Sequence, residues 1–239
     1  MNERAFFAIH SALPREGPGD RASLAWAMAF ARPPADGRIL DAGCGPGADI
    51  PGLLDYVPRG EVVAVDLHAP FANQVRARFR GDARVTVRHG DMLAQSGPFD
   101  LIWAAGSLYA PGVEAALPVM RRMLVPGGRI VFSDLCWTGP ERPPEAVDFF
   151  ATEYPDMGDE GTLRTRVARA GLRFQTVCKL PPAAWEAYYG PLENRLDLLR
   201  RDLPDDPEIA TQVAAHEREI AVWRAHGDAF GYLLCVTAR

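Results

Sequence analysis

The sequence predicts an α/β protein built on a doubly wound, mostly parallel sheet. Three observations support this fold class. Strand and helix patterns alternate from residue 37 to 134, several strands are apolar throughout, and a glycine-rich turn directly follows the first strand. Strands that alternate with helices form parallel sheets covered on both faces. With 239 residues, of which 48% are hydrophobic, the chain is long enough to fill one core.

The alternating region supplies the first five strands. We expect these strands at Arg38–Ala42, Glu61–Asp66, Arg84–His89, Phe99–Ala104 and Arg129–Asp134. We expect the helices between them at Asp49–Val57, Ala69–Phe79 and Val113–Leu124. The last of these helices is stopped by a Pro-Gly-Gly turn at residues 126–128, which reverses the chain into the fifth strand.

The rest of the chain departs from simple alternation. Helical patterns cover Pro143–Thr152 and Asp159–Ala170, and a sixth strand is expected at Arg173–Leu180. Two long helices, Pro182–Asp202 and Asp205–His226, precede a last strand at Gly231–Ala238. We therefore expect a single domain with an N-terminal cap (1–32), a core (33–181), a helical lid (182–228) and a final strand (229–239).

Composition narrows the class of protein. The formal net charge of -5 argues against broad electrostatic attraction to nucleic acid. No apolar run approaches the ~20 residues that span a bilayer, and the N-terminus lacks a signal-peptide core. Four scattered cysteines, without metal-ligand spacing, indicate reduced thiols and no metal site. We expect a cytoplasmic enzyme without a nucleic-acid or membrane partner. The oligomeric state, a homodimer included, stays open.

The glycine turn indicates a nucleotide-like ligand. Gly43, Gly45 and Gly47 lack a Cβ, so the backbone can turn sharply and a ligand can approach it closely. The turn also satisfies the dinucleotide pattern, and Asp66 stands where that pattern expects an acid for the ribose. On this evidence, an NAD enzyme and an adenosyl-binding enzyme remain level.

Three further features separate the two cofactors. Asp41 precedes the first glycine, where a negative charge would repel a pyrophosphate but suit a ligand that carries an ammonium and a sulfonium. Asp91 and Met92 follow the third strand, where they could meet the amine and the ring of an adenine. The Pro-Gly-Gly turn precedes the fifth strand. In this order and spacing, residues 38–134 and the final strand resemble the class I S-adenosylmethionine-dependent methyltransferases.

This resemblance implies a seven-stranded sheet with an antiparallel last strand, and it implies S-adenosylmethionine as the cofactor. Asp41 and the loop Gly43-Cys44-Gly45-Pro46-Gly47 would lie near the methionine part. Asp66 would hold the ribose hydroxyls and Leu67 would pack beside the adenine. Asp91 would accept from the adenine amine with Met92 against the ring, and Ala104 and Ala105 would pass near the sulfonium.

The flanking segments resemble a narrower group of bacterial, largely uncharacterised methyltransferases. The shared features are an Arg-x-Gly-Pro-Gly segment, here Arg15 to Gly19, and a late Trp-x-x-Tyr-Tyr-x-Pro-Leu element, here Trp185 to Leu192. The resemblance implies that residues 15–19 fold over the exposed edge of the cofactor, with Arg15 and Gly19 in contact with it. It also implies that the aromatic residues line a lid.

An enzyme that transfers a methyl group contributes mainly by positioning the two reactants. It needs a general base only if the acceptor must lose a proton. His10 and Glu153 are the candidate bases, and Tyr109 and Tyr154 are candidates for orienting a substrate. The leading hypothesis is a methyltransferase for a small molecule with a nitrogen or oxygen acceptor. The alternatives are an NAD-dependent oxidoreductase and a catalytically silent cofactor-binding module.

Overall fold

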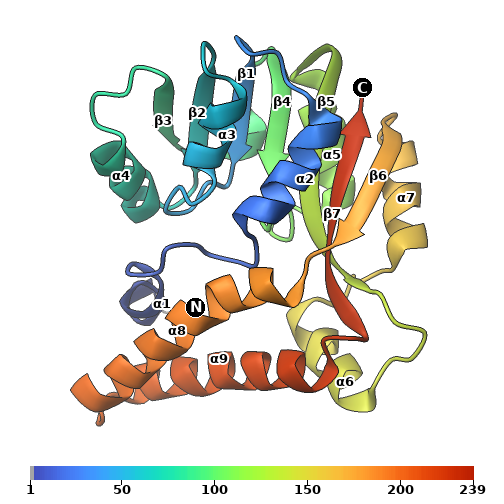
Figure 1. Ribbon diagram of the computed structural model, residues 1–239. Helices are drawn as coiled ribbons and strands as arrows, with labels where there is room; N and C mark the ends of the chain where they lie inside the picture. The colour runs from blue at the N-terminus through green and yellow to red at the C-terminus, as the bar shows by residue number, and fades with distance from the viewer. Residues whose placement is uncertain (1–2) are drawn as a thin grey trace.

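A computed structural model describes residues 3–239 and contains one seven-stranded sheet in the order β3-β2-β1-β4-β5-β7-β6 (Figure 1). β7 runs antiparallel to both of its neighbours, and the pairs among β1 to β5 are parallel. The predicted fold class is therefore confirmed. The strands are β1 Arg38–Ala42, β2 Glu61–Asp66, β3 Val85–His89, β4 Phe99–Ala104, β5 Leu124–Trp137, β6 Arg173–Lys179 and β7 Phe230–Ala238.

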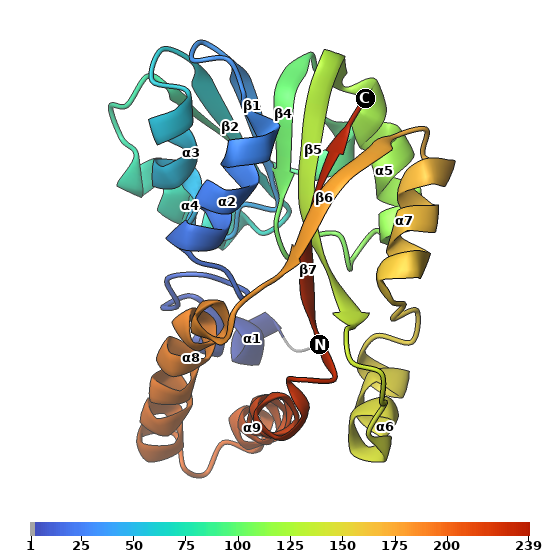
Figure 2. The same cartoon turned by 45° about the vertical axis from the view of Figure 1, so that its right-hand side comes forward.

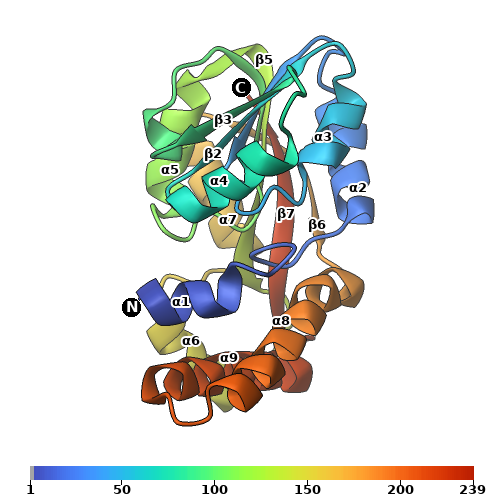
Figure 3. The same ribbon diagram turned by 90° about the vertical axis from the view of Figure 1, so that its left-hand side faces the viewer.

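Helices cover both faces of this sheet because its central strands are apolar on both sides. α2 (Arg21–Ala31), α3 (Ile50–Tyr56) and α4 (Ala69–Arg78) pack on one face (Figure 3). α5 (Val113–Arg122) and α7 (Glu160–Arg169) pack on the other, together with the short 3-10 turn Met92–Ala94. The core thus consists of two apolar layers separated by the sheet.

A third apolar cluster lies beyond the carboxyl ends of the parallel strands. It is built by α1 (Glu3–His10), α6 (Pro144–Glu153), α8 (Pro182–Asp202) and α9 (Pro207–His226), which we call the cap (Figure 2). Aromatic side chains fill much of it, because the cap must cover a sheet end rather than a sheet face. Among residues 3–239 no helix has the length and apolar character needed to cross a membrane.

The cap differs from the one expected over residues 1–32. Only α1 and the segment after it lie there, because α2 packs its buried face against α3, β5 and β7. Asp20 begins α2 by accepting a hydrogen bond from Ser23 N (2.7 Å), as an N-cap does. α6, which the expected boundaries assign to the core, places Phe149 and Phe150 in the cap cluster.

β5 is longer than the predicted Arg129–Asp134. It starts at Leu124, bulges through the Pro-Gly-Gly turn, where Pro126 and Gly127 are exposed, and continues to Trp137. Its last residues pair with β7, Cys136 opposite Gly231 and Trp137 opposite Phe230. This long antiparallel partner, far away in sequence, explains why the strand extends beyond its local pattern.

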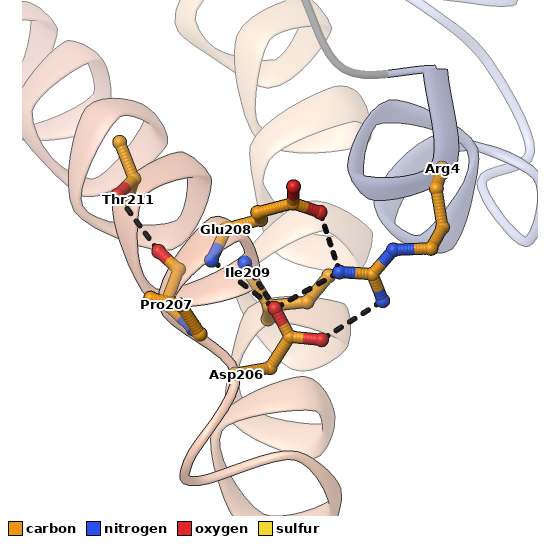
Figure 4. Close-up of polar contacts among 6 residues, drawn as sticks. All are labelled: Arg4, Asp206, Pro207, Glu208, Ile209 and Thr211. Atoms are coloured by element: carbon orange, nitrogen blue, oxygen red, sulfur yellow. Dashed lines mark hydrogen bonds and ion pairs between the residues drawn. The ribbon is translucent and has the colours of Figure 1, made fainter.

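An ion-pair cluster joins α1 to the start of α9 (Figure 4). Arg4 places Nη1 2.8 Å from Asp206 Oδ2 and Nη2 2.6 Å from Glu208 Oε2. Asp206 Oδ1 also accepts from the amides of Glu208 and Ile209, which caps α9. Exposed ion pairs add little stability, so the buried Ala5 and Ile9 supply most of the contact that holds α1 in the cap.

Because the central strands are buried, shortening a side chain there should measurably lower the stability of the fold. Ile102 in β4 is fully buried, so Ile102→Ala should lower the free energy of unfolding by about 2–5 kcal/mol through lost burial and a residual cavity. Urea denaturation of the purified chain measures this change. The control Leu198→Ala on α8, where the side chain is 41% exposed, should change it by less than about 0.5 kcal/mol. Equal effects of the two substitutions would contradict the burial assigned to β4.

Candidate functional site

A cavity of about 670 Å³ lies between the carboxyl ends of the parallel strands and the cap. One wall consists of the turns after β1, β2, β3 and β4, and the opposite wall consists of cap side chains. Glu16, Gly17 and Pro18 form part of the lining between the two walls. In open parallel sheets, ligands bind at this end of the strands.

The glycine turn after β1 forms part of the strand-side wall. Gly43, Gly45 and Gly47 all have positive φ (77°, 51° and 81°), a conformation that side chains with a Cβ rarely adopt. A Cβ on Gly43 would lie 2.5 Å from the Cβ of Ser107, so the loop after β4 can approach only a glycine there. Ser107 Oγ donates to the carbonyl of Ala42 (2.7 Å) and joins these two loops.

The loop amides are held by the protein itself. The amides of Gly43 and Cys44 donate to the Val65 carbonyl, and the amide of Gly45 donates to Asp66 Oδ2 (2.8 Å). Asp66 Oδ1 accepts from the amide of His68 (2.8 Å). These three amides are therefore not free to bind a ligand. The Asp66 carboxylate, which lines the cavity, instead fixes the shape of the loop.

Asp41 lies behind the loop rather than in the cavity wall. Its side chain is 4% exposed, and Oδ2 has no hydrogen-bond partner among residues 3–239. Burial, with Asp49 and Asp66 nearby, raises its pKa well above the usual range. Arg15 Nη2 lies 3.6 Å from Asp49 Oδ1, and the Arg15 side chain packs against Gly19. A buried carboxyl group without a partner beside the loop would gain from a neighbouring cation.

The structure brings together most of the predicted site residues. The cavity is lined by nine of them: His10, Gly43, Gly45, Asp66, Leu67, Asp91, Met92, Tyr109 and Tyr154. Seven others do not line it: Arg15, Gly19, Asp41, Cys44, Gly47, Ala104 and Ala105. Gly47 faces the core near Ile50 and Val75, and Ala104 is fully buried in β4. After β4, Gly106 and Ser107 reach the cavity in place of the two alanines.

Asp91 and Met92 follow β3 and lie at the rim of the cavity. Asp91 accepts from the amide of Leu93 (2.7 Å) and so caps the 3-10 turn. Met92 is half-buried, and Leu67 after β2 is 66% exposed. An exposed leucine and a half-buried methionine leave room for a flat apolar group at this rim.

A short chain of ionisable groups crosses the cavity from the N-terminal segment to α9. Glu16 Oε2 lies 2.7 Å from His10 Nδ1, although the two lack hydrogen-bond geometry, and His10 Nε2 lies 3.2 Å from His216 Nε2. Burial lowers the pKa of His10 to about 4. Burial, and then Asp66, raises the pKa of Glu16 to about 8. Near neutral pH we therefore expect a neutral imidazole beside a protonated carboxyl group. Glu16 was missed in the sequence because an acid in a Pro/Gly-rich stretch has no local signal.

A second pair of groups lies at the end of β5. The Tyr154 hydroxyl donates to Asp134 Oδ1 (2.7 Å), and Arg166 Nη1 approaches Oδ2 to 3.5 Å without a hydrogen bond. Burial raises the pKa of Asp134, and Tyr154 and Arg166 oppose that rise. The hydrogen bond to Asp134 holds the Tyr154 hydroxyl in place. Tyr109 is 68% exposed, and within residues 3–239 no side chain forms such a hydrogen bond with its hydroxyl.

Aromatic side chains of the cap line the wall of the cavity opposite the strand ends. Trp185 and Trp223 stack with ring centroids 5.3 Å apart, and Tyr189 packs on both. The Tyr189 hydroxyl donates to Glu219 Oε1 (3.0 Å). Burial raises the pKa of Glu219, and His216 opposes that rise. Of the aromatic residues expected to line a lid, Trp185, Tyr188 and Tyr189 lie in the cavity lining.

Comparisons with known proteins agree with this geometry. Residues 39–128 match the family model of a methyltransferase domain. Over 137 residues the chain is 31% identical to a malonyl-[acyl-carrier protein] O-methyltransferase from Enterobacter lignolyticus, which covers 52% of this chain and 53% of that relative. The chain thus spans about half the length of this curated relative.

Solved structures match along almost the whole chain. An S-adenosylmethionine-dependent methyltransferase from Thiobacillus denitrificans, in complex with S-adenosyl-L-homocysteine, superposes with a TM-score of 0.82. The two are 22% identical, over 99% of this chain and 98% of that one. A second such complex, from Geobacter sulfurreducens, gives 0.80 at 21% identity, over 99% and 98%. The class I methyltransferase fold that the sequence resembles is confirmed.

The raised pKa of Glu16 predicts a pH dependence of stability. Between pH 6.5 and 8 the folded chain keeps a proton on Glu16 that the unfolded chain releases, so stability falls as the pH rises. His10 opposes this fall only slightly, because its imidazole is neutral in the folded chain and, in the unfolded chain, passes from half protonated at pH 6.5 to neutral at pH 8. Glu16→Gln should remove a fall of up to about 2 kcal/mol in the free energy of unfolding.

Urea denaturation at pH 6.5 and pH 8 measures this difference for the wild type and the variant. Glu114→Gln, on the exposed face of α5, is the matched control and should keep the wild-type fall. A Glu16→Gln variant whose stability falls as much as that of the wild type would show that Glu16 titrates normally.

Proposed function

We propose that this chain, whose residues 39–128 match the family model of a methyltransferase domain, transfers a methyl group from S-adenosylmethionine to a small molecule. The observation that carries the proposal is the convergence of the glycine loop, Asp66 and Asp91 on one cavity at the carboxyl ends of β1, β2 and β3. The accepting atom is a nitrogen or an oxygen.

The residues at this end of the sheet fit such a cofactor. A ribose needs acceptors for its hydroxyls, and the Asp66 carboxylate opens on the cavity. An adenine needs an apolar face and an acceptor for its amine, which Leu67, Met92 and Asp91 offer at the rim. A cationic amino group needs a carboxylate, and Asp41 is buried beside the loop with Oδ2 unpartnered. When bound, the cofactor would supply an activated methyl group on a sulfonium.

Other residues that line the cavity would position the molecule that accepts the methyl group. Tyr154, held by Asp134, and Tyr109 would orient it, and the buried His10 imidazole, neutral above pH 4, could take up a proton that the acceptor loses. A cavity of about 670 Å³ suits a small molecule better than a duplex. The relative from Enterobacter lignolyticus is named for an O-methyl transfer, which keeps oxygen among the candidate acceptors.

Two other functions predict different binding. An NAD-dependent oxidoreductase should bind NADH tightly and S-adenosylhomocysteine not at all. A silent cofactor-binding module should bind S-adenosylhomocysteine but release none from S-adenosylmethionine over a panel of amines, alcohols and phenols. Calorimetric titration with both cofactors, followed by that turnover panel, distinguishes all three.

The role of Asp66 makes a sharper prediction. Asp66→Ala removes acceptors for ribose hydroxyls, each charge-assisted hydrogen bond being worth about 1.5–3 kcal/mol, and also frees the Gly45 amide. The dissociation constant for S-adenosylhomocysteine should rise at least about tenfold, which corresponds to about 1.4 kcal/mol. Isothermal titration calorimetry measures it, and circular dichroism checks folding.

Asp82→Asn is the control for this experiment, because it alters an acid at the start of β3, beside Arg84 and outside the cavity lining. It should leave the dissociation constant unchanged. A folded Asp66→Ala variant with wild-type affinity would refute the assignment of Asp66.

A further inference from the structure

The cap side of the cavity, where the methyl acceptor would bind, has many acidic side chains in its lining. Carboxyl groups of Glu16, Asp134, Glu153 and Glu219 line it in addition to Asp66 and Asp91 on the strand side. Within residues 3–239, no lysine or arginine contributes to the lining. Arg166 and Arg218 approach Asp134 and the Phe149 ring, but neither is among the lining residues. An anionic acceptor would therefore enter without a counter-charge from this wall.

Glu219 is a lining carboxyl group that contacts the aromatic side chains of α8. It projects from α9 and accepts from the Tyr189 hydroxyl (3.0 Å), and no lysine or arginine within residues 3–239 forms an ion pair with it. Burial, and then Glu219, raises the pKa of the Tyr232 phenol, which lines the same cavity. Glu219 is half-buried, and burial raises its pKa while His216 opposes the rise, so a cation from a ligand would lower the cost of ionising it.

Aromatic side chains enclose the same region. Trp185, Trp223, Tyr188, Tyr189 and Tyr232 line the cavity around Glu219. Trp185 also lies 5.4 Å from Tyr232 between ring centroids. The face of an aromatic ring attracts a cation, and its apolar surface accepts a hydrocarbon body. A carboxyl group surrounded by such rings is complementary to an ammonium group on an apolar skeleton.

We propose that the acceptor of this enzyme is an apolar amine and that Glu219 binds its ammonium group. This inference rests on the proposed function, since it names the class of molecule that receives the methyl group. It chooses nitrogen over oxygen and excludes carboxylates and phosphate esters as acceptors. Because an ammonium nitrogen has no free electron pair, it must first lose a proton, which the His10 imidazole in the same lining would take up. The neutral amine would then accept the methyl group. Tyr189 holds the Glu219 carboxyl in place, and Trp185 and Trp223 cover the cation.

Three probes with similar apolar bodies and different head groups test the proposal: 2-phenylethylamine, 3-phenylpropan-1-ol and 3-phenylpropionate. Isothermal titration of the full chain should show the amine binding at least about tenfold more tightly than the alcohol, with the carboxylate weakest. Equal or tighter binding of the carboxylate, or the alcohol, would overturn the proposal. So would a lack of amine binding at millimolar concentration.

The variant Glu219→Gln keeps an acceptor for Tyr189 but removes the charge. It should weaken amine binding at least about tenfold and leave alcohol binding unchanged. Glu217→Gln, an exposed position on the same helix that pairs with Arg200, is the matched control and should leave both unchanged. An unaltered ratio of amine to alcohol affinity in Glu219→Gln would also overturn the proposal.

Titration with S-adenosylhomocysteine, run in parallel, separates this inference from the proposed function. A chain that binds S-adenosylhomocysteine but does not prefer the amine contradicts only the amine inference. A chain that prefers the amine but does not bind S-adenosylhomocysteine contradicts the proposed function and leaves Glu219 as an ammonium site.

Discussion

The carboxylate of Asp66 joins the end of β2 to the glycine loop after β1, and the strand-side wall of the cavity depends on this contact. One oxygen accepts from the Gly45 amide and the other from the His68 amide, so a single side chain fixes two turns. The positive φ angles of the loop let its backbone fold back toward β2 and bring the Gly45 amide to Asp66. Gly43 then allows Ser107 to pack closely, which adds the β4 turn to the same wall. Three neighbouring strand ends become one rigid surface in this way.

The opposite wall has a different physical origin. α1, α6, α8 and α9 come from three distant parts of the chain and share one apolar cluster. Apart from the ends of β5 and β7, the cluster consists mainly of helical side chains, which can differ from those of other chains with this fold at little cost to the sheet. The contact of Arg4 with Asp206 and Glu208 adds an exposed link between α1 and α9. The geometry of the strand-side wall, where the methyl donor would bind, therefore follows from the fold of the sheet. The chemistry of the opposite wall, where the acceptor would bind, follows from the side chains of the cap.

The sequence predicted the first wall far better than the second, for a physical reason. Asp41, the glycines, Asp66 and Asp91 each stand at the end of a strand with a clear apolar pattern, so local spacing alone places them at one sheet edge. Glu16, His216 and Glu219 stand on no such pattern, and only tertiary packing brings them to the cavity. The same limit explains why α2 was assigned to the cap and why β5 was predicted too short, because β7 extends its pairing from more than ninety residues away. Asp41 shows a subtler limit, since sequence position cannot distinguish a carboxyl in the wall from one just behind it.

Burial links the two walls energetically. Asp41, Glu16, Asp134 and Glu219 all have pKa values raised by loss of solvent, so each would be harder to ionise in the empty protein than in water. A folded protein holds such groups only where the rest of the structure is stable enough, and here the continuous apolar layers on both faces of the sheet provide that stability. A cation that enters from outside lowers these pKa values and recovers part of the cost, whereas an anion raises it further. On the cap side, where Glu16, Asp134 and Glu219 line the cavity, this is the electrostatic basis of the proposed preference for a cation, whereas Asp41 lies behind the glycine loop and outside the lining.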